Sequence, residues 1–226
     1  MLKLLDSSAQ SVFVDMFGDP VQNPKNWPRV RFGELLDRIE SGWSPVCLDR
    51  PAEGNEWAVL KLGAVTSCEY DSNENKALPM GLAPDPRLEV KPGDLLFSRK
   101  NTYELVAACA LVFETRPRLM MPDLIFRFRI SPGVGLDVNY LHQLLVNTSK
   151  RGELRKLASG SAGSMPNISK AKLLDVQIEV PPESLQLQFA RQVTKLREQV
   201  QLQRRALMKH NALFLALQYK AFRGEL

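Results

Sequence analysis

Residues that bind metals or form disulfides are scarce in this chain of 226 residues, which contains three cysteines and two histidines. The cysteines are scattered without a CxxC pair, so neither a disulfide framework nor a zinc site is expected, and a reducing compartment fits. No run approaches the roughly 18 apolar residues that a membrane span requires. The short apolar start, which polar residues follow at once, is not a signal peptide. We therefore expect a cytoplasmic protein with no metal site and no membrane partner.

Motifs for common enzyme chemistry are also lacking. The chain has no HExxH metalloprotease motif and no GxxxxGK[ST] phosphate-binding loop. It also has no Asn-Pro-Pro-aromatic motif of an adenine methyltransferase, since residues 23–26 (NPKN) do not qualify. A magnesium nuclease is an alternative, because residues 74–76 (ENK) and 89–91 (EVK) match a Glu-x-Lys motif, and Asp49 or Asp85 would supply a second carboxylate. Such tripeptides are common by chance, so we expect no catalytic residue and no cofactor on this chain.

Positive charge is concentrated in the second half of the sequence. Residues 1–98 hold ten basic and fifteen acidic side chains, a net charge of −5, whereas residues 99–172 hold twelve basic and five acidic ones, a net charge of +7. Residues 183–226 add eight basic and three acidic side chains, or +5. Charge segregation of this kind favours a polyanionic partner such as nucleic acid.

The middle of the chain mixes short strand and helix patterns without a regular βαβ rhythm. Residues 3–17 predict a short amphipathic helix, and the turn formers of residues 19–30 predict a linker or an ordered turn. Residues 138–157 have helical spacing. Strands are predicted for residues 57–62, 94–98, 107–113, 124–130 and 172–180. In residues 124–130 two arginines alternate with two phenylalanines, as in a half-exposed strand, and the two arginines could equally form an exposed strand face. These patterns predict one mixed α+β domain.

The last segment predicts a single long helix. Residues 183–223 contain neither Gly nor Pro, and ten positions in two heptad-spaced series include eight apolar residues, as in a coiled-coil seam. Such a helix would be about 60 Å long, so its apolar stripe needs a partner helix. The polar Gln203 and His210 either fix the register or mark a place where the helices splay apart. The predicted dimer interface consists of Phe189, Val193, Leu196, Val200, Gln203, Leu207, His210, Phe214 and Leu217.

Several segments together resemble the specificity subunits of type I restriction-modification systems. Each is a weak motif alone, but their order and spacing extend over essentially the whole chain. They are MFGDP at 16–20 with NPKNWP at 23–28, SGWSP at 41–45 with LKLGAVT at 60–66, KPGDLLFSR at 91–99, IEVPP at 178–182 with LQLQ at 185–188, and LQYKAFRGEL at 217–226.

The resemblance implies a non-catalytic DNA-reading subunit. Such subunits have two target-recognition domains and two long helices in a pseudo-symmetric pair, whereas this chain resembles one half. The implied parts are a helix end at 1–18, a DNA-binding domain at 19–182, and at 183–226 a long coiled-coil helix for dimerisation and methyltransferase docking. Two antiparallel copies would read an interrupted palindrome in double-stranded DNA, and a partner methyltransferase would carry the S-adenosylmethionine. Whether a restriction subunit joins stays open. The alternative is a dimeric scaffold or decoy that pairs with specificity subunits without reading DNA.

Candidate DNA contacts follow from residue type and place. Arg grips guanine and Asn grips adenine through paired hydrogen bonds, and residues 99–103 directly follow a predicted strand, although a solvated turn is the alternative there. Phosphate contacts are expected in the small-residue loop near 160 and the lysines after it. The predicted base contacts are Arg99, Lys100, Asn101, Thr102 and Tyr103, with Trp43 and Lys61 second, and the predicted phosphate contacts are Ser161, Ser164, Asn167, Lys170 and Lys172.

Overall fold

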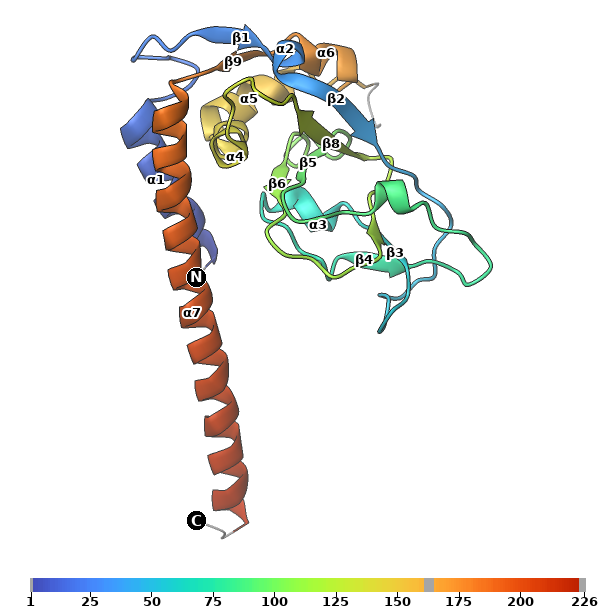
Figure 1. The fold of residues 1–226 in the computed structure, drawn as a ribbon. Coiled ribbons are helices and arrows are strands. Elements are labelled where there is room, and N and C mark those ends of the chain that lie inside the picture. Colours follow the sequence, from blue (N-terminus) through green and yellow to red (C-terminus); the bar gives the residue numbers. More distant parts are fainter. Residues whose placement is uncertain (1, 161–164, 224–226) are drawn as a thin grey trace.

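The computed structural model describes residues 2–160 and 165–223. A globular part of mixed strands and helices carries one long helix that runs away from it (Figure 1). The elements are α1 (Leu2–Phe17), β1 (Arg29–Arg31), α2 (Phe32–Leu35), β2 (Leu36–Ser41), β3 (Ala58–Leu60), α3 (Gly63–Thr66), β4 (Asn75–Ala77), the 3₁₀ helix η1 (Pro86–Leu88), β5 (Leu95–Ser98), β6 (Cys109–Leu111), β7 (Leu119–Met120), β8 (Ile125–Ile130), α4 (Val138–Val146), α5 (Thr148–Lys156), α6 (Lys170–Leu174), β9 (Gln177–Glu179) and α7 (Glu183–Phe222). The predicted α+β class and the long C-terminal helix are confirmed.

A four-stranded antiparallel sheet, in the order β2-β8-β5-β6, forms the centre of the globular part. Because side chains alternate along a strand, β5 contributes to two apolar clusters. Leu95 and Phe97 pack with α1, α4 and the start of α7. Leu96, between them, packs with β3 and α3. The sheet therefore joins a helical layer on one face to a smaller unit on the other.

The smaller unit is built around a second sheet of three strands. In it β3 pairs antiparallel with β4 and parallel with β7. A separate two-stranded sheet pairs β1 with β9, with Arg29 opposite Glu179. This pairing brings the segment that follows α1 next to the segment that leads into α7. None of the helices in the described ranges has the length and apolar character needed to span a bilayer.

The turn-forming segment after α1 is an ordered turn rather than a loose linker. The Asp19 carboxylate accepts hydrogen bonds from the backbone amides of Val21 at 2.9 Å and Gln22 at 3.0 Å. The indole of Trp27 donates to the carbonyl of Phe17 at 2.9 Å, and Lys25 donates to the carbonyl of Met16 at 2.8 Å. These bonds satisfy the last carbonyls of α1 and fix the path into β1.

The prediction of an exposed arginine face on residues 124–130 is wrong for Arg127. Only 2% of this side chain is exposed. Its guanidinium binds the carboxylates of Asp94 at 2.9 Å and of Glu40, and Arg129 binds Asp94 at 2.7 Å. A buried charge is tolerated only when it is paired and hydrogen-bonded. The polar positions of β8 therefore stabilise the contact between β8, β2 and the turn before β5.

Two other segments differ from the predicted elements. The predicted helix 138–157 is divided at Asn147, whose backbone is extended (φ −55°, ψ 135°) and whose side chain accepts the Ser149 amide at 3.0 Å to begin α5. The predicted strand 172–180 is confirmed only at Gln177–Glu179, which form β9. Its first three residues belong to helix α6, because the Ser169 hydroxyl accepts the Lys172 amide at 3.3 Å as the N-cap. At these positions the Asn and Ser side chains bind backbone amides and begin a new helix, so the predicted helix or strand does not continue.

The first half of α7 is buried within the chain itself. Figure 1 shows α1 lying along this half, while the remainder extends freely to the C-terminal end. Phe13 and Phe17 of α1 surround Phe189 at ring-centroid distances of 5.8 and 5.4 Å, and Tyr140 of α4 stacks on Phe13 at 5.6 Å. Phe189 and Val193 are both 0% exposed. These two predicted dimer residues are thus already covered by α1 and α4 and are not available to a second copy.

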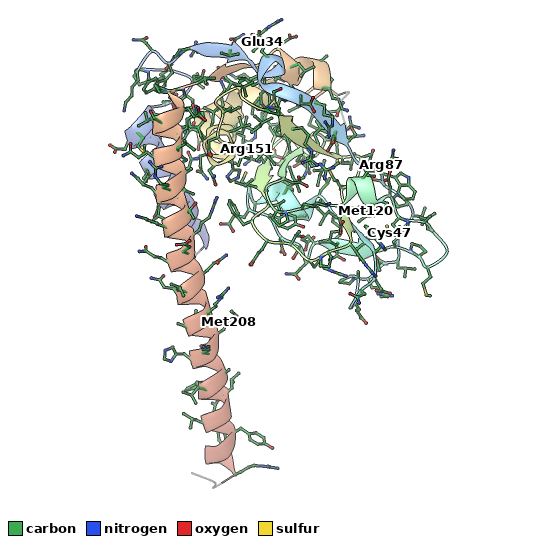
Figure 2. All side chains as sticks on the ribbon, in the orientation of Figure 1. Glu34, Cys47, Arg87, Met120, Arg151 and Met208 are labelled. Atoms are coloured by element: carbon green, nitrogen blue, oxygen red, sulfur yellow. The ribbon has the colours of Figure 1, made fainter. Side chains whose placement is uncertain are left out.

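The second half of α7 presents an exposed apolar stripe. Leu207 is 48% exposed, Phe214 64% and Leu217 43%, and Gln203 and His210 are exposed between them. Leu196 and Val200 are half-buried at the boundary. Met208 also projects from this free half (Figure 2). Six of the nine predicted dimer positions, from Val200 to Leu217, are therefore exposed or partly exposed. Leu196, next to the covered part of the helix, is also partly exposed.

Candidate nucleic-acid interface

Four segments that are distant in sequence meet at one end of the central sheet. The amide of Trp43 donates to the carbonyl of Met121 at 3.0 Å. The Arg99 amide donates to Leu124 at 3.1 Å, and its carbonyl accepts from the amide of Ile168 at 2.8 Å. We call this surface the candidate interface. It comprises residues 41–44, 99–103, 121–124, and the described parts of 159–172.

Arg99 lies at the centre of the candidate interface. Its Nε donates to the carbonyl of Asp123 at 2.8 Å, and its Nη1 donates to Oδ1 of Asn167 at 3.2 Å. The guanidinium lies 5.2 Å from the centroid of the Phe126 ring, and Lys170 Nζ lies 5.5 Å from the same centroid. A guanidinium has five N–H donors, so these contacts orient Arg99 and leave donors for a ligand.

The loop that follows β5 differs from the prediction at one residue. Asn101 is only 5% exposed, and its Oδ1 accepts the amide of Thr102 at 2.8 Å. Its side chain therefore faces inward in this structure, and its role as an adenine contact stays a prediction. Thr102 is exposed, Tyr103 is 55% exposed and Lys100 is half-buried. Of the predicted contacts in this loop, Lys100, Thr102 and Tyr103 thus reach solvent, as do the neighbouring Glu104 and Leu105.

Two arginines of α5 support this loop from behind, and the sequence reasoning did not identify them. Arg151 Nη2 donates to the carbonyls of Glu104 and Leu105 at 3.3 and 3.4 Å, and Arg155 also donates to Glu104. Arg151 Nη1 lies 3.3 Å from the sulfur of Cys68, and Figure 2 shows Arg151 between the helical layer and the sheets. Burial lowers the pKa of the Arg151 guanidinium. The i, i+4 spacing of two arginines was the available signal.

Two of the predicted phosphate contacts, Asn167 and Lys170, lie beside Arg99, and Lys172 lies next to Ser159. Lys170 Nζ donates to the carbonyl of Ile39 at 2.7 Å. Lys172 Nζ donates to the Leu157 carbonyl at 2.8 Å and to the Ser159 hydroxyl at 3.2 Å. Both lysines are exposed, so their charge faces solvent. Ser161 and Ser164 lie outside the described residues.

Lys61 is not part of the candidate interface. It lies on the three-stranded unit, where its Nζ pairs with Glu74 at 3.0 Å. Lys76 pairs there with Asp49 at 2.7 Å, and this hydrogen bond lowers the pKa of the Asp49 carboxyl. Glu74 and Asp49, two carboxylates of the alternative nuclease site, are thus each paired with a lysine. Among residues 2–160 and 165–223 no group of three or more His, Cys, Asp or Glu side chains is placed to hold a metal.

Sequence comparison identifies relatives of this chain. No family model matches it. It is 36% identical to the Escherichia coli type I restriction enzyme EcoEI specificity subunit over 169 residues, which are 74% of this chain and 28% of that protein. It is 26% identical to the EcoKI specificity subunit of Escherichia coli strain K12 over 205 residues, 88% of this chain and 43% of that protein. The chain thus spans less than half the length of either relative.

Solved structures share the fold. The HsdS subunit from Thermoanaerobacter tengcongensis gives a TM-score of 0.52 at 24% identity, covering 99% of this chain and 52% of that one. The S subunit of a type I restriction-modification system from M. genitalium gives 0.52 at 9% identity, covering 93% and 51%. The resemblance that the sequence motifs indicated is therefore confirmed. The chain is a homologue of type I restriction enzyme specificity subunits and covers a region about the size of one target-recognition domain.

Proposed function

We propose that this chain reads DNA sequence for a type I restriction-modification system and performs no chemistry itself. The observation that carries the proposal is the candidate interface, where Arg99, Lys170 and Lys172 lie beside the exposed Thr102 and Tyr103. Cations position a protein on the phosphate backbone, and neighbouring side chains that reach the base edges supply sequence discrimination.

The free half of α7 supports an assembly of two such readers. Its stripe around Leu207 and Phe214 is exposed in one copy, and a second α7 in antiparallel orientation would cover it. Two domains at opposite ends of a helix pair would read two half-sites at a set separation, so the target would be an interrupted palindrome. A methyltransferase subunit bound to the helices would supply the S-adenosylmethionine and the adenine chemistry.

Selection from a random-sequence duplex library tests DNA reading. The chain, together with a methyltransferase subunit of a type I system, should enrich one interrupted palindrome. A variant with Thr102→Ala and Tyr103→Ala should lose about 5- to 150-fold in affinity for the selected duplex, as expected when base contacts worth about 1–3 kcal/mol are removed. Glu53→Ala, an exposed change outside the candidate interface and α7, is the control and should keep the enrichment. Assembly with the methyltransferase but no enriched sequence would favour the scaffold or decoy function.

Light scattering tests the pairing through α7. Introducing charge with Leu207→Glu and Phe214→Glu should convert a dimer into a monomer, because buried unpaired charges oppose association. Gln201→Glu, exposed on the same helix, is the control and should leave the dimer intact. Substitutions are preferable to truncation after Pro182, because truncation would also uncover Phe13. A wild-type monomer at micromolar concentration would contradict the homodimer and the palindrome.

A further inference from the structure

The long helix touches the globular part at a second place beyond its buried start. The Arg197 guanidinium lies 3.5 Å from the centroid of the Phe113 ring, in the segment that follows β6. Its Nη1 donates to Oδ1 of Asn139 on α4 at 3.3 Å. A guanidinium stacked on an aromatic face and hydrogen-bonded at its edge is held in both distance and orientation. We call these three residues the Arg197 clamp.

His142 of α4 is a titratable group near the clamp. Burial, followed by the charge of Arg197, lowers the pKa of His142 to about 4. It is therefore neutral at pH 7 and does not repel the guanidinium. Phe113 is 43% exposed, so part of its ring is covered on the side of Arg197 and part faces solvent. The contact thus lies at the edge of the domain, where α7 leaves it.

Because the clamp lies near the base of the free part of α7, a small shift at the clamp causes a larger displacement at the end of the helix. Phe189 and Val193 anchor the helix near its start, and from residue 201 onward every side chain that the structure describes on α7 is exposed. At 1.5 Å per residue, Arg197 lies about 12 Å beyond Phe189, and about 38 Å of helix follows it to Phe222. With the pivot at Phe189, a lateral shift of about 1 Å at Arg197 moves Phe222 by about 4 Å. The rise of one DNA base pair is about 3.4 Å.

We propose that Arg197 is a positioning residue that holds α7 at one angle to the globular part and thereby restricts the spacing between two DNA half-sites. The spacing role rests on the proposed function, in which two copies joined through α7 each read one half-site. An α7 free to swing by a few ångströms at its end would accept spacers that differ by one base pair. A fixed α7 would accept one spacer length, because each added base pair both lengthens and rotates the second half-site.

The angle of the helix is measurable without DNA. Spin labels at Lys91→Cys and Lys209→Cys, both exposed positions, would report the distance between domain and free helix in a Cys47→Ser background. Labelled chains diluted with unlabelled ones keep the measurement within one chain. We expect a narrow distance distribution for the otherwise wild-type chain and a broader one for Arg197→Ala. Arg191→Ala, an exposed arginine two turns earlier on the same helix, is the control and should leave the distribution narrow.

Variants of the aromatic partner separate the clamp from general packing. Phe113→Leu keeps an apolar side chain but removes the ring and should broaden the distribution as Arg197→Ala does. Phe113→Trp keeps a face for the guanidinium, since Trp is the best cation–π partner, and should restore the narrow distribution. A distribution unchanged by both Arg197→Ala and Phe113→Leu would overturn the proposal.

Spacer preference tests the consequence for DNA. The duplex selected by the wild-type chain is compared with duplexes whose spacer is one base pair shorter or longer. We expect Arg197→Ala to lower the preference for the selected spacer by about fivefold, without loss of recognition of each half-site. Equal preference in wild type and variant, despite a broader distance distribution, would overturn the role in spacing. Failure of the wild-type chain to select any sequence would refute DNA reading and the spacing role together, and the distance distributions would still report whether Arg197 orients α7.

Discussion

The buried His142 makes the stability of the protein sensitive to mild acid. Its Nε2 lies 3.3 Å from the carbonyl of Cys68 and 3.2 Å from that of Cys109, so α4 is tied to both segments through a neutral ring. Burial, and then the charge of Arg197, lowers its pKa from 6.5 to about 4, against the opposing effect of the two carbonyls. In the unfolded chain the same ring takes up a proton near pH 6.5. Acidification below pH 6.5 therefore favours the unfolded state.

The size of the effect follows from the two pKa values. The contribution of the neutral His142 to the free energy of unfolding is fully present above pH 6.5. It is lost as the pH falls toward 4, and the total loss is about 3.4 kcal/mol. Between pH 7.5 and pH 5.5 the loss is about 1.3 kcal/mol. Carboxylates with lowered pKa values, such as Glu40 beside Arg127, titrate below this window. Most of the pH dependence between 7.5 and 5.5 is thus expected to come from His142.

Urea unfolding followed by tryptophan fluorescence at both pH values measures this contribution. His142→Gln should lower the stability at pH 7.5, because its amide replaces the ring imperfectly, and should remove about 1.3 kcal/mol of the pH-dependent loss. His210→Gln, on the exposed half of α7, is the matched control. Protein concentration is held constant, because association through α7 would itself stabilise the chain. Equal pH dependence in wild type and His142→Gln would refute the assignment.

Three further predictions follow from the packing and the charges. Asp94→Asn should lower the free energy of unfolding by about 1.5–3 kcal/mol, because it removes one of the two carboxylates that pair with the buried Arg127 and leaves only Glu40. Asp49→Asn, at a carboxylate 95% exposed, should change it by less than about 0.5 kcal/mol, and similar losses in the two urea titrations would contradict the buried network. Phe13→Ala should cost about 3–5 kcal/mol and also loosen the start of α7, seen as faster hydrogen exchange there, and protection equal to wild type would show that α1 does not hold the helix. Lys172→Ala should reduce the slope of log affinity against log salt for duplex DNA by about 0.9 for each domain, and an unchanged slope would remove Lys172 from the phosphate contacts.

The sequence predicted best those features that depend on local periodicity. The long helix was predictable because residues 183–223 lack Gly and Pro and keep one heptad pattern throughout. Strands such as β5 and β8 were predictable because their apolar residues alternate or form short runs. Residues 99–103, Asn167 and Lys170 were predicted as DNA contacts from residue type, but their meeting in the fold was not predicted. Lys61 was selected with them and lies elsewhere.

Features that depend on partners far away in sequence were not predictable in this way. The alternation in β8 is the same whether Arg127 faces water or meets Glu40, which lies 87 residues away. The heptad pattern of α7 likewise does not distinguish a second copy from α1, which covers Phe189. Asn101 follows a strand as an exposed reader would, and only the packing of the loop turns it inward. In each case the residue was correctly interpreted as polar or apolar, but the sequence did not reveal which part of the chain it contacts.

The distribution of charge gives a reason for the proposed dimer. Three of the twelve cations in residues 99–172 form ion pairs with carboxylates outside that segment, namely Arg127, Arg129 and Lys150. The net charge of +7 therefore overstates the field that DNA would meet, and the cations at the candidate interface are few. A domain with few phosphate contacts binds weakly alone. Two such domains on one rigid helix pair gain affinity by binding together, provided their separation matches the DNA. In the proposed dimer the helix that supplies this gain in affinity would also make the gain depend on the spacing of the half-sites. The Arg197 clamp would therefore act on both affinity and specificity.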